Sequence, residues 1–197
     1  MSANMPRRTY HHGNLRESLL KAAVRAIAEL GPAAFTLREV ARRAGVSHNA
    51  PYRHFQDKDA LLSAVAAQGF RELTAGMMEA GARQGSALER LKDSGLAYVA
   101  FALRKPEHFT VMFDSPVCVS KDPEYVAASQ EAFQTLVHFV RDCQEEGVLP
   151  ADHSQERVLY AWSLVHGIAK LAVAGRLPFR TRAGMLKFAK FAIDESI

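Results

Sequence analysis

Residues 36–58 read TLREVARRAGVSHNAPYRHFQDK, and this stretch determines how the chain is organised. Thr36 and Glu39 form the T-x-x-E pattern of a capping box, in which each side chain can bond a backbone N–H of the other residue. Gly45 suits the left-handed position after a helix end, and Ser47 is a favourable N-cap for a second helix. The stretch therefore predicts two short helices joined by a tight turn, with the second helix offered to the major groove of DNA.

The second predicted helix, residues 48–55, carries side chains of the types that contact DNA. Asn49 can pair with adenine and Arg53 with guanine, while Ala50 can contact a thymine methyl group. Three further side chains suit phosphate oxygens, which position a protein without reading sequence: Tyr52, His54 and Lys58. The alternative is a surface helix hairpin whose polar residues only face water. The order of caps, glycine turn and DNA-reading residues favours the DNA interpretation.

Pro51 is unusual in this position. If Ser47 is the N-cap, Pro51 falls at the fourth helical position, where it removes the first hydrogen bond of the helix. We therefore expect a short second helix that is distorted in its first turn.

The run FTLREVARRAGVS at 35–47, followed by YRHF at 52–55 and KDALL at 58–62, resembles the TetR/AcrR family of one-component transcriptional regulators. The resemblance is close from about Leu15 to Leu62. It implies a three-helix DNA-binding head, a helical ligand-binding body and a homodimer. It also implies phosphate contacts from Tyr52, His54 and Lys58, and positions at or near base edges for Arg38, His48, Asn49, Ala50 and Arg53. Thr36 and Ser47, which cap the two helices, complete the expected DNA-binding set.

The charge of the chain is concentrated in its N-terminal third. Residues 1–58 hold ten Lys and Arg against four Asp and Glu, whereas the remaining residues hold 15 against 17. A basic segment joined to a slightly acidic remainder is typical of a nucleic-acid-binding head on a body of another role. The expected division is a DNA-binding domain with an N-terminal arm over residues 1–58, and a regulatory and dimerisation domain over 59–197.

Other classes of protein find little support. The chain has two cysteines, no secretory signal at its start and no apolar run near the roughly 18 residues of a membrane span. These features indicate a cytoplasmic protein with reduced thiols that does not contact membranes. No catalytic motif, cofactor-binding loop or compact metal-ligand spacing is present, so we expect no enzyme, cofactor or metal. The remaining alternative is a helical small-molecule-binding module, or a metal or redox sensor, without specific DNA readout.

Helical periodicity continues to the C-terminus and predicts an all-α chain of about nine helices. The first helix is capped by Asn14 and ends at Gly31 and Pro32. After the two helices of the opening stretch, helices are expected from Asp57 to about Ala82, from Ala87 to Arg104, and over a short segment at 107–113. The next begins at Asp122 and Pro123 and ends at Gly147. The last two begin at Asp152 or Ser154, and near Thr181.

The body has a second point of resemblance. Trp162, His166 and Gly167 form W-x-x-x-H-G, which with YHHGNL at 10–15 and KPEHF at 105–109 resembles the TetR-like proteins with a WHG-type C-terminal domain. The resemblance implies a homodimer through the last two helices, bound to a near-palindromic operator on double-stranded DNA. Repression is the usual mode of action in the family.

Trp162 and His166 lie one helical turn apart on a single apolar face. They could line a ligand pocket with an indole wall and a hydrogen-bonding imidazole, or they could belong to a packed core in which the histidine bonds a polar neighbour. Other side chains could line the same cavity or fill the same core: Phe101, Phe109, Met112, Phe113 and Phe133. The functional hypothesis is a regulator released from its operator when a small apolar effector binds this set.

Overall fold

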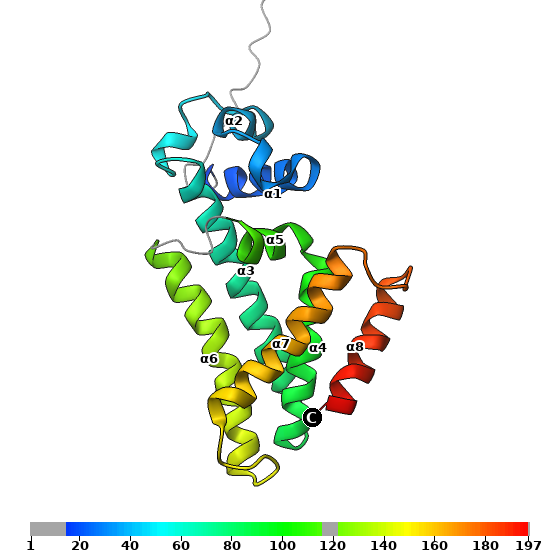
Figure 1. The fold of residues 1–197 in the computed structure, drawn as a ribbon. Helices are drawn as coiled ribbons and strands as arrows, with labels where there is room; N and C mark the ends of the chain where they lie inside the picture. Colours follow the sequence, from blue (N-terminus) through cyan, green and yellow to red (C-terminus); the bar gives the residue numbers. More distant parts are fainter. Residues whose placement is uncertain (1–14, 116–121, 197) are drawn as a thin grey trace, which may run out of the picture.

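The computed structural model describes residues 15–115 and 122–196, and over these ranges every regular element is a helix (Figure 1). The all-α prediction is confirmed. The elements are α1 (Leu15–Ala34), α2 (Leu37–Ala44), a short 3₁₀ turn (Pro51–Arg53), α3 (Lys58–Gly81), α4 (Ala87–Arg104), α5 (Pro106–Asp114), α6 (Pro123–Glu145), α7 (Ser154–Val173) and α8 (Arg182–Ser196). The N-terminal arm, the Asn14 cap and Cys118 fall outside the described residues.

Side chains cap the helices where the sequence places them. Thr36, Asp57 and Asp122 each accept a hydrogen bond from the backbone N–H three residues ahead. Thr181 does the same for Gly184 at the start of α8. These bonds satisfy donors that a helix start leaves without a partner, and they explain why the element boundaries follow the sequence closely.

Two elements differ from the prediction. The first helix does not end at Gly31 and Pro32: α1 is kinked at Gly31, which has a φ of 77°, and continues with Pro32 inside it to Ala34. The predicted second helix of the helix-turn-helix differs more. Residues 47–55 form turns around a single 3₁₀ turn at Pro51–Arg53, so eight α-helices are described instead of nine. Pro51 has no N–H, and its place at the first position of the 3₁₀ turn is one that proline tolerates. The bonds from Ala50 to Ser47 and from His54 to Pro51 span three residues and keep the segment tightly wound.

α1, α2 and the 3₁₀ turn form a head at one end of the molecule, and α3 runs from this head into the body (Figure 1). α5 lies between head and body and packs against both α1 and α3. α3, α4, α6 and α7 surround the middle of the body, with α8 beside α4 and α7. One cluster of buried residues extends from α1 in the head to α8 in the body. None of the described helices combines the length and the apolar character needed to cross a membrane.

Candidate DNA-binding head and interior cavity

The head presents most of the predicted DNA-binding side chains at its surface. Eight of the ten predicted residues are exposed: Thr36, Arg38, Ser47, His48, Asn49, Tyr52, Arg53 and His54. Within the described part of the chain, neither Arg38 nor Arg53 forms an ion pair. The guanidinium groups of Arg38 and Arg53 and the amide of Asn49 are therefore exposed to solvent and available to contact DNA.

Ala50 is placed differently from the expectation. Its side chain is only 9% exposed and belongs to the buried cluster, together with Pro51 and Phe55. The contact with a thymine methyl group expected from the sequence is therefore wrong for this conformation. The tight winding imposed at Pro51 turns Ala50 inward, where it anchors the segment to the head.

Lys58 also differs from the expectation of a phosphate contact. Its Nζ donates a hydrogen bond of 2.6 Å to the carbonyl oxygen of Ala33, and it lies 4.6 Å from the centre of the Phe35 ring. A lysine that bonds a carbonyl near a helix end and stands over an aromatic face stabilises the fold. In this structure the partly exposed ammonium of Lys58 is therefore bonded within the head.

A network of charges joins α1 and α2. Arg43 donates to Glu29 of α1 and to Glu39 of α2, both over 2.7 Å, and Arg42 forms two further bonds to Glu39. These bonds hold the pKa of Glu39 at about 2, well below its usual 4.5. The Thr36 hydroxyl accepts a hydrogen bond from the N–H of Glu39, which is the first bond of the expected capping box. The Glu39 carboxylate accepts hydrogen bonds from Arg42 and Arg43 in place of the second bond, to the N–H of Thr36. Arg42 and Arg43 are therefore structural residues.

One cluster of ion pairs connects the head to the body. Glu124, near the start of α6, lies 2.7 Å from Arg16 of α1 and 2.8 Å from Arg71 of α3. The guanidinium of Arg16 also lies 5.6 Å from the centre of the ring of Phe55, the last residue of the segment 47–55. The residues next to this cluster in sequence, Phe70 and Tyr125, pack edge to face at 5.8 Å.

Phe70 and Tyr125 line a partly open cavity of about 310 Å³ that is formed by α3, α4, α5, α6 and α7, with Ile193 of α8. Four of the predicted ligand-binding residues line it as well: Met112, Phe113, Phe133 and Trp162. Phe101 and Phe109, at 2% and 0% exposure, do not line the cavity, so the expectation that they border it is corrected: they are core residues. The cavity is also lined by Ser94, Tyr98 and Ser129, which the sequence does not single out because their helical spacing is the same as that of filled core positions.

His166 stands one layer behind the cavity wall. Its Nδ1 lies 2.8 Å from the hydroxyl of Tyr98, which does line the cavity. The imidazole also packs against the rings of Phe109, Phe113 and Trp162 at centroid distances of 4.7–5.8 Å. Burial lowers the pKa of His166. The histidine thus bonds a polar neighbour, as the core alternative expected, and that neighbour faces the cavity.

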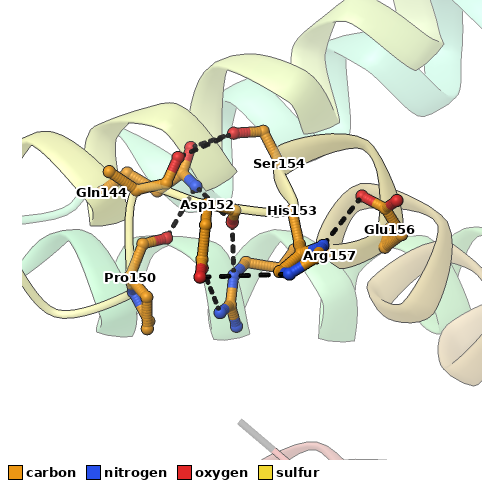
Figure 2. A network of polar contacts seen from close by, with 8 residues as sticks. Gln144, Pro150, Asp152, His153, Ser154, Glu156 and Arg157 are labelled. Carbon is orange, nitrogen blue, oxygen red and sulfur yellow. Dashed lines mark hydrogen bonds and ion pairs between the residues drawn. The ribbon is translucent and has the colours of Figure 1, made fainter.

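A second cavity, of about 320 Å³, lies where the connection between α6 and α7 meets the ends of α4 and α8. Leu91 and Ala161 border both cavities. Figure 2 shows the polar network that shapes this connection: Gln144 donates to the carbonyl of Pro150, Ser154 donates to Gln144, and Arg157 bonds Asp152. These bonds hold the backbone in a conformation that requires a left-handed residue before α7, which here is His153 with φ 50°.

Two observations bear on the alternative of a metal or redox sensor. No group of three or more His, Cys, Asp or Glu side chains within 15–115 and 122–196 is arranged to hold a metal ion. Cys143 is fully buried, and burial raises the pKa of its thiol to about 11. A protonated, buried thiol is a poor nucleophile and a poor redox sensor.

Comparison with known proteins agrees with this geometry. The profile described as bacterial regulatory proteins, tetR family, matches residues 19–65, and the profile of the tetracyclin repressor-like C-terminal domain matches residues 91–194. Over 48 residues the chain is 46% identical to a helix-turn-helix-type transcriptional repressor of Mycobacterium tuberculosis, a match that covers 24% of this chain and 26% of that protein. Over 58 residues it is 41% identical to the transcriptional regulator BetI of Stenotrophomonas maltophilia, covering 29% and 30%. The chain thus matches less than a third of the length of these relatives.

Solved structures extend the likeness to the whole chain. A protein of unknown function from Rhodococcus sp. RHA1 shares 32% identity, with a TM-score of 0.81 over 97% of this chain and 99% of its own. A regulatory protein of the tetR family from Rhodococcus RHA1 has the same fold at 18% identity, with a TM-score of 0.72 over 92% and 96%. Since the C-terminal profile alone covers more than half of the sequence and the tetR profile covers the head, the chain belongs to the TetR family of bacterial regulatory proteins.

Proposed function

We propose that this regulator is a repressor that binds a specific operator through residues 1–58 and leaves it when a small molecule enters the body. The observation that carries the proposal is the exposed set of His48, Asn49 and Arg53 on a basic head, with Arg53 in no ion pair of the described residues. Asn and Arg are the side chains that pair bidentately with adenine and guanine. The regulator would act in the cytoplasm on double-stranded DNA.

A mobility-shift titration with the DNA upstream of the regulator's own gene tests the DNA proposal. Arg53→Ala should lose about 1–3 kcal/mol on the operator and much less on random DNA, because a base contact discriminates between sequences. Arg25→Ala is a matched control, since Arg25 is an exposed arginine of α1 outside the reading segment. It should weaken both DNAs to a similar, smaller extent through the loss of one positive charge. Equal losses on operator and random DNA for Arg53→Ala would contradict the proposal.

The operator-binding species would be a homodimer formed through α7 and α8. These two helices carry large apolar side chains that the protomer leaves exposed: Leu159, Tyr160, Leu171 and Phe191. A glycine in α7, Gly167, has no neighbouring atom within 4 Å of where a Cβ would lie, so a second backbone could approach closely there. Two heads related by a two-fold axis would read a near-palindromic site with half-sites about one DNA turn, or a multiple of it, apart.

The effector would bind in the cavity of about 310 Å³, which lies within the range of small-molecule sites. It must bind the DNA-incompetent arrangement of the heads more tightly than the competent one, and a tenfold loss of operator affinity needs a difference of about 1.4 kcal/mol. The exposed Arg16–Glu124 pair alone is worth at most about 1 kcal/mol. The larger part of the free-energy coupling between the cavity and the head must therefore come from side-chain packing along α3 and α5. α5 contacts α1 and contributes residues to the cavity wall.

Phe113→Ala tests this route. The substitution enlarges the cavity and removes a ring that packs on Phe70 and His166, so it should change effector affinity with little effect on ligand-free operator binding. Loss of operator binding without any ligand, in a variant that keeps its helical content, would instead show that Phe113 maintains the DNA-competent state.

A further inference from the structure

The cavity wall carries no formal charge. Within the described part of the chain, none of the residues that line it is Asp, Glu, Lys, Arg or His. Two basic side chains close to lining residues are already paired: Arg71, next to Phe70 in the sequence, with Glu124, and Lys170 with Asp114, next to Phe113 in the sequence. An anion transferred into such a site would lose its hydration without gaining a counter-charge, which costs several kcal/mol.

Two serine side chains of the wall already donate their hydroxyl hydrogens to backbone carbonyl groups. Ser94 donates to the carbonyl oxygen of Leu91 over 2.8 Å, and Ser129 donates to that of Val126 over 3.0 Å. The Tyr98 hydroxyl lies 2.8 Å from Nδ1 of His166. Which of these two groups donates depends on the tautomer of the imidazole, so Tyr98 does not decide the pattern. What the two serine hydroxyls still offer is an oxygen lone pair, which accepts a hydrogen bond.

From this pattern we infer that the cavity selects an uncharged, largely apolar molecule that carries a hydrogen-bond donor, such as a phenol or an alcohol, and discriminates against carboxylates. The inference rests on the proposed ligand response and specifies its chemistry. The aromatic part of the wall, which includes Phe70, Phe113, Phe133 and Trp162, suits a flat or ring-containing body. The donor would reach the oxygen of Ser94 or Ser129.

The protein contains its own reporter of binding. Trp162 is the single tryptophan of the sequence and it lines the cavity, so a bound molecule should change its fluorescence. Three probes of the same body distinguish the chemistry: 4-hydroxybiphenyl, 4-methoxybiphenyl and biphenyl-4-carboxylate. The hydroxyl probe should bind about tenfold more tightly than the methoxy probe, which has lost one donor. The carboxylate should bind more weakly by about 100-fold or more.

Two variants make the test specific. Ser94→Ala removes one acceptor and should reduce the preference for hydroxyl over methoxy without changing the binding of the methoxy probe. Ser129→Lys places a cation in the wall and should raise the affinity for the carboxylate above that for the hydroxyl probe. Thermal unfolding by circular dichroism establishes that both variants fold.

The possible failures are distinct. A carboxylate that binds the wild-type protein as tightly as the hydroxyl probe would overturn the inference and leave a ligand-responsive regulator standing. Equal binding of hydroxyl and methoxy probes would overturn the requirement for a donor. If none of the probes changes Trp162 fluorescence, even in Phe133→Ala, where the half-exposed ring beside Trp162 is removed, the cavity does not bind ligands and both the inference and the effector proposal fail. Operator binding, measured by mobility shift, would be unaffected by that outcome.

Discussion

A methyl group built on Gly69 of α3 would lie 2.5 Å from Sδ of Met112 in α5 and 3.1 Å from Cβ of His108. α3 and α5 therefore approach each other so closely that a methyl group at this point would force the Met112 side chain or α5 to shift. The other glycine in the middle of α3, Gly76, has no neighbouring atom within 4 Å of that position. The two glycines, which look alike in the sequence, have different roles.

This pair gives the first prediction. Gly76→Ala should stabilise the protein by up to about 1 kcal/mol, because alanine is the better helix former and nothing obstructs its methyl group. Gly69→Ala should destabilise it, because α5 must shift and the gain in helix propensity is smaller than the cost of the clash. Urea unfolding of both variants measures the difference. Equal stabilisation by the two substitutions would show that α5 can move freely against α3.

The second prediction concerns Lys58. Lys58→Ala should lower the free energy of unfolding by about 1 kcal/mol, since it removes the bond to Ala33 and the contact with the Phe35 ring. Lys21→Ala is the control: its exposed pair with Glu17 should contribute only a few tenths of a kcal/mol. Unchanged stability together with a uniform loss of affinity for all DNA would restore the phosphate contact expected from the sequence.

The third prediction is a pH dependence. Because the folded protein holds the pKa of Glu39 at about 2, against 4.5 without its partners, the charged carboxylate stabilises the head. This contribution is complete above about pH 4.5 and is lost as the pH falls through about 2. Glu39→Gln should therefore be less stable than wild type at pH 7, and the difference should shrink between pH 4.5 and 2 when followed by urea unfolding. A difference that is constant over this range would contradict the role given to Arg42 and Arg43.

The fourth prediction addresses the proposed dimer. Phe191→Glu or Leu171→Glu, at side chains 61% and 48% exposed in the protomer, should yield folded monomers with weakened operator affinity, as measured by light scattering and mobility shift. Met78→Glu, on an exposed methionine of α3, should leave the dimer intact. Ala172 and Ala189 are unsuitable for this purpose because both are buried in the protomer, at 5% and 0%, and a glutamate there would damage the fold itself. A dimer that survives both substitutions in α7 and α8 would place the interface elsewhere.

Local chemistry explains which parts of the fold are predictable from the sequence. Caps at Thr36, Asp57 and Asp122 depend on residues three positions apart, so they are visible in the sequence alone. The capping box of Ser86 and Glu89 at the start of α4 has the same local form. The missing N–H of Pro51 predicts a distorted first turn. The extent of the 3₁₀ turn cannot be predicted in the same way, because it depends on the burial of Ala50 in the head.

Relationships between distant residues were beyond the reach of the sequence. Arg16 and Glu124 are 108 positions apart, and no local pattern joins them. The cavity raises a different difficulty, since a residue beside a cavity and a residue in filled core follow the same helical spacing. Phe101 and Tyr98 lie one turn apart in α4, yet only Tyr98 borders the cavity. That distinction depends on the volumes of facing side chains and not on periodicity.

The tight winding of residues 47–55 separates two tasks within one short segment. Ala50, Pro51 and Phe55 are buried and anchor the segment, whereas His48, Asn49 and Arg53 are exposed and free to change. New operator preferences could therefore be acquired by exchanging the outer side chains alone, at little risk to the head. For protein engineering, positions 48, 49 and 53 are therefore the ones to vary when a different DNA specificity is wanted, while the buried residues 50, 51 and 55 keep the conformation of the segment.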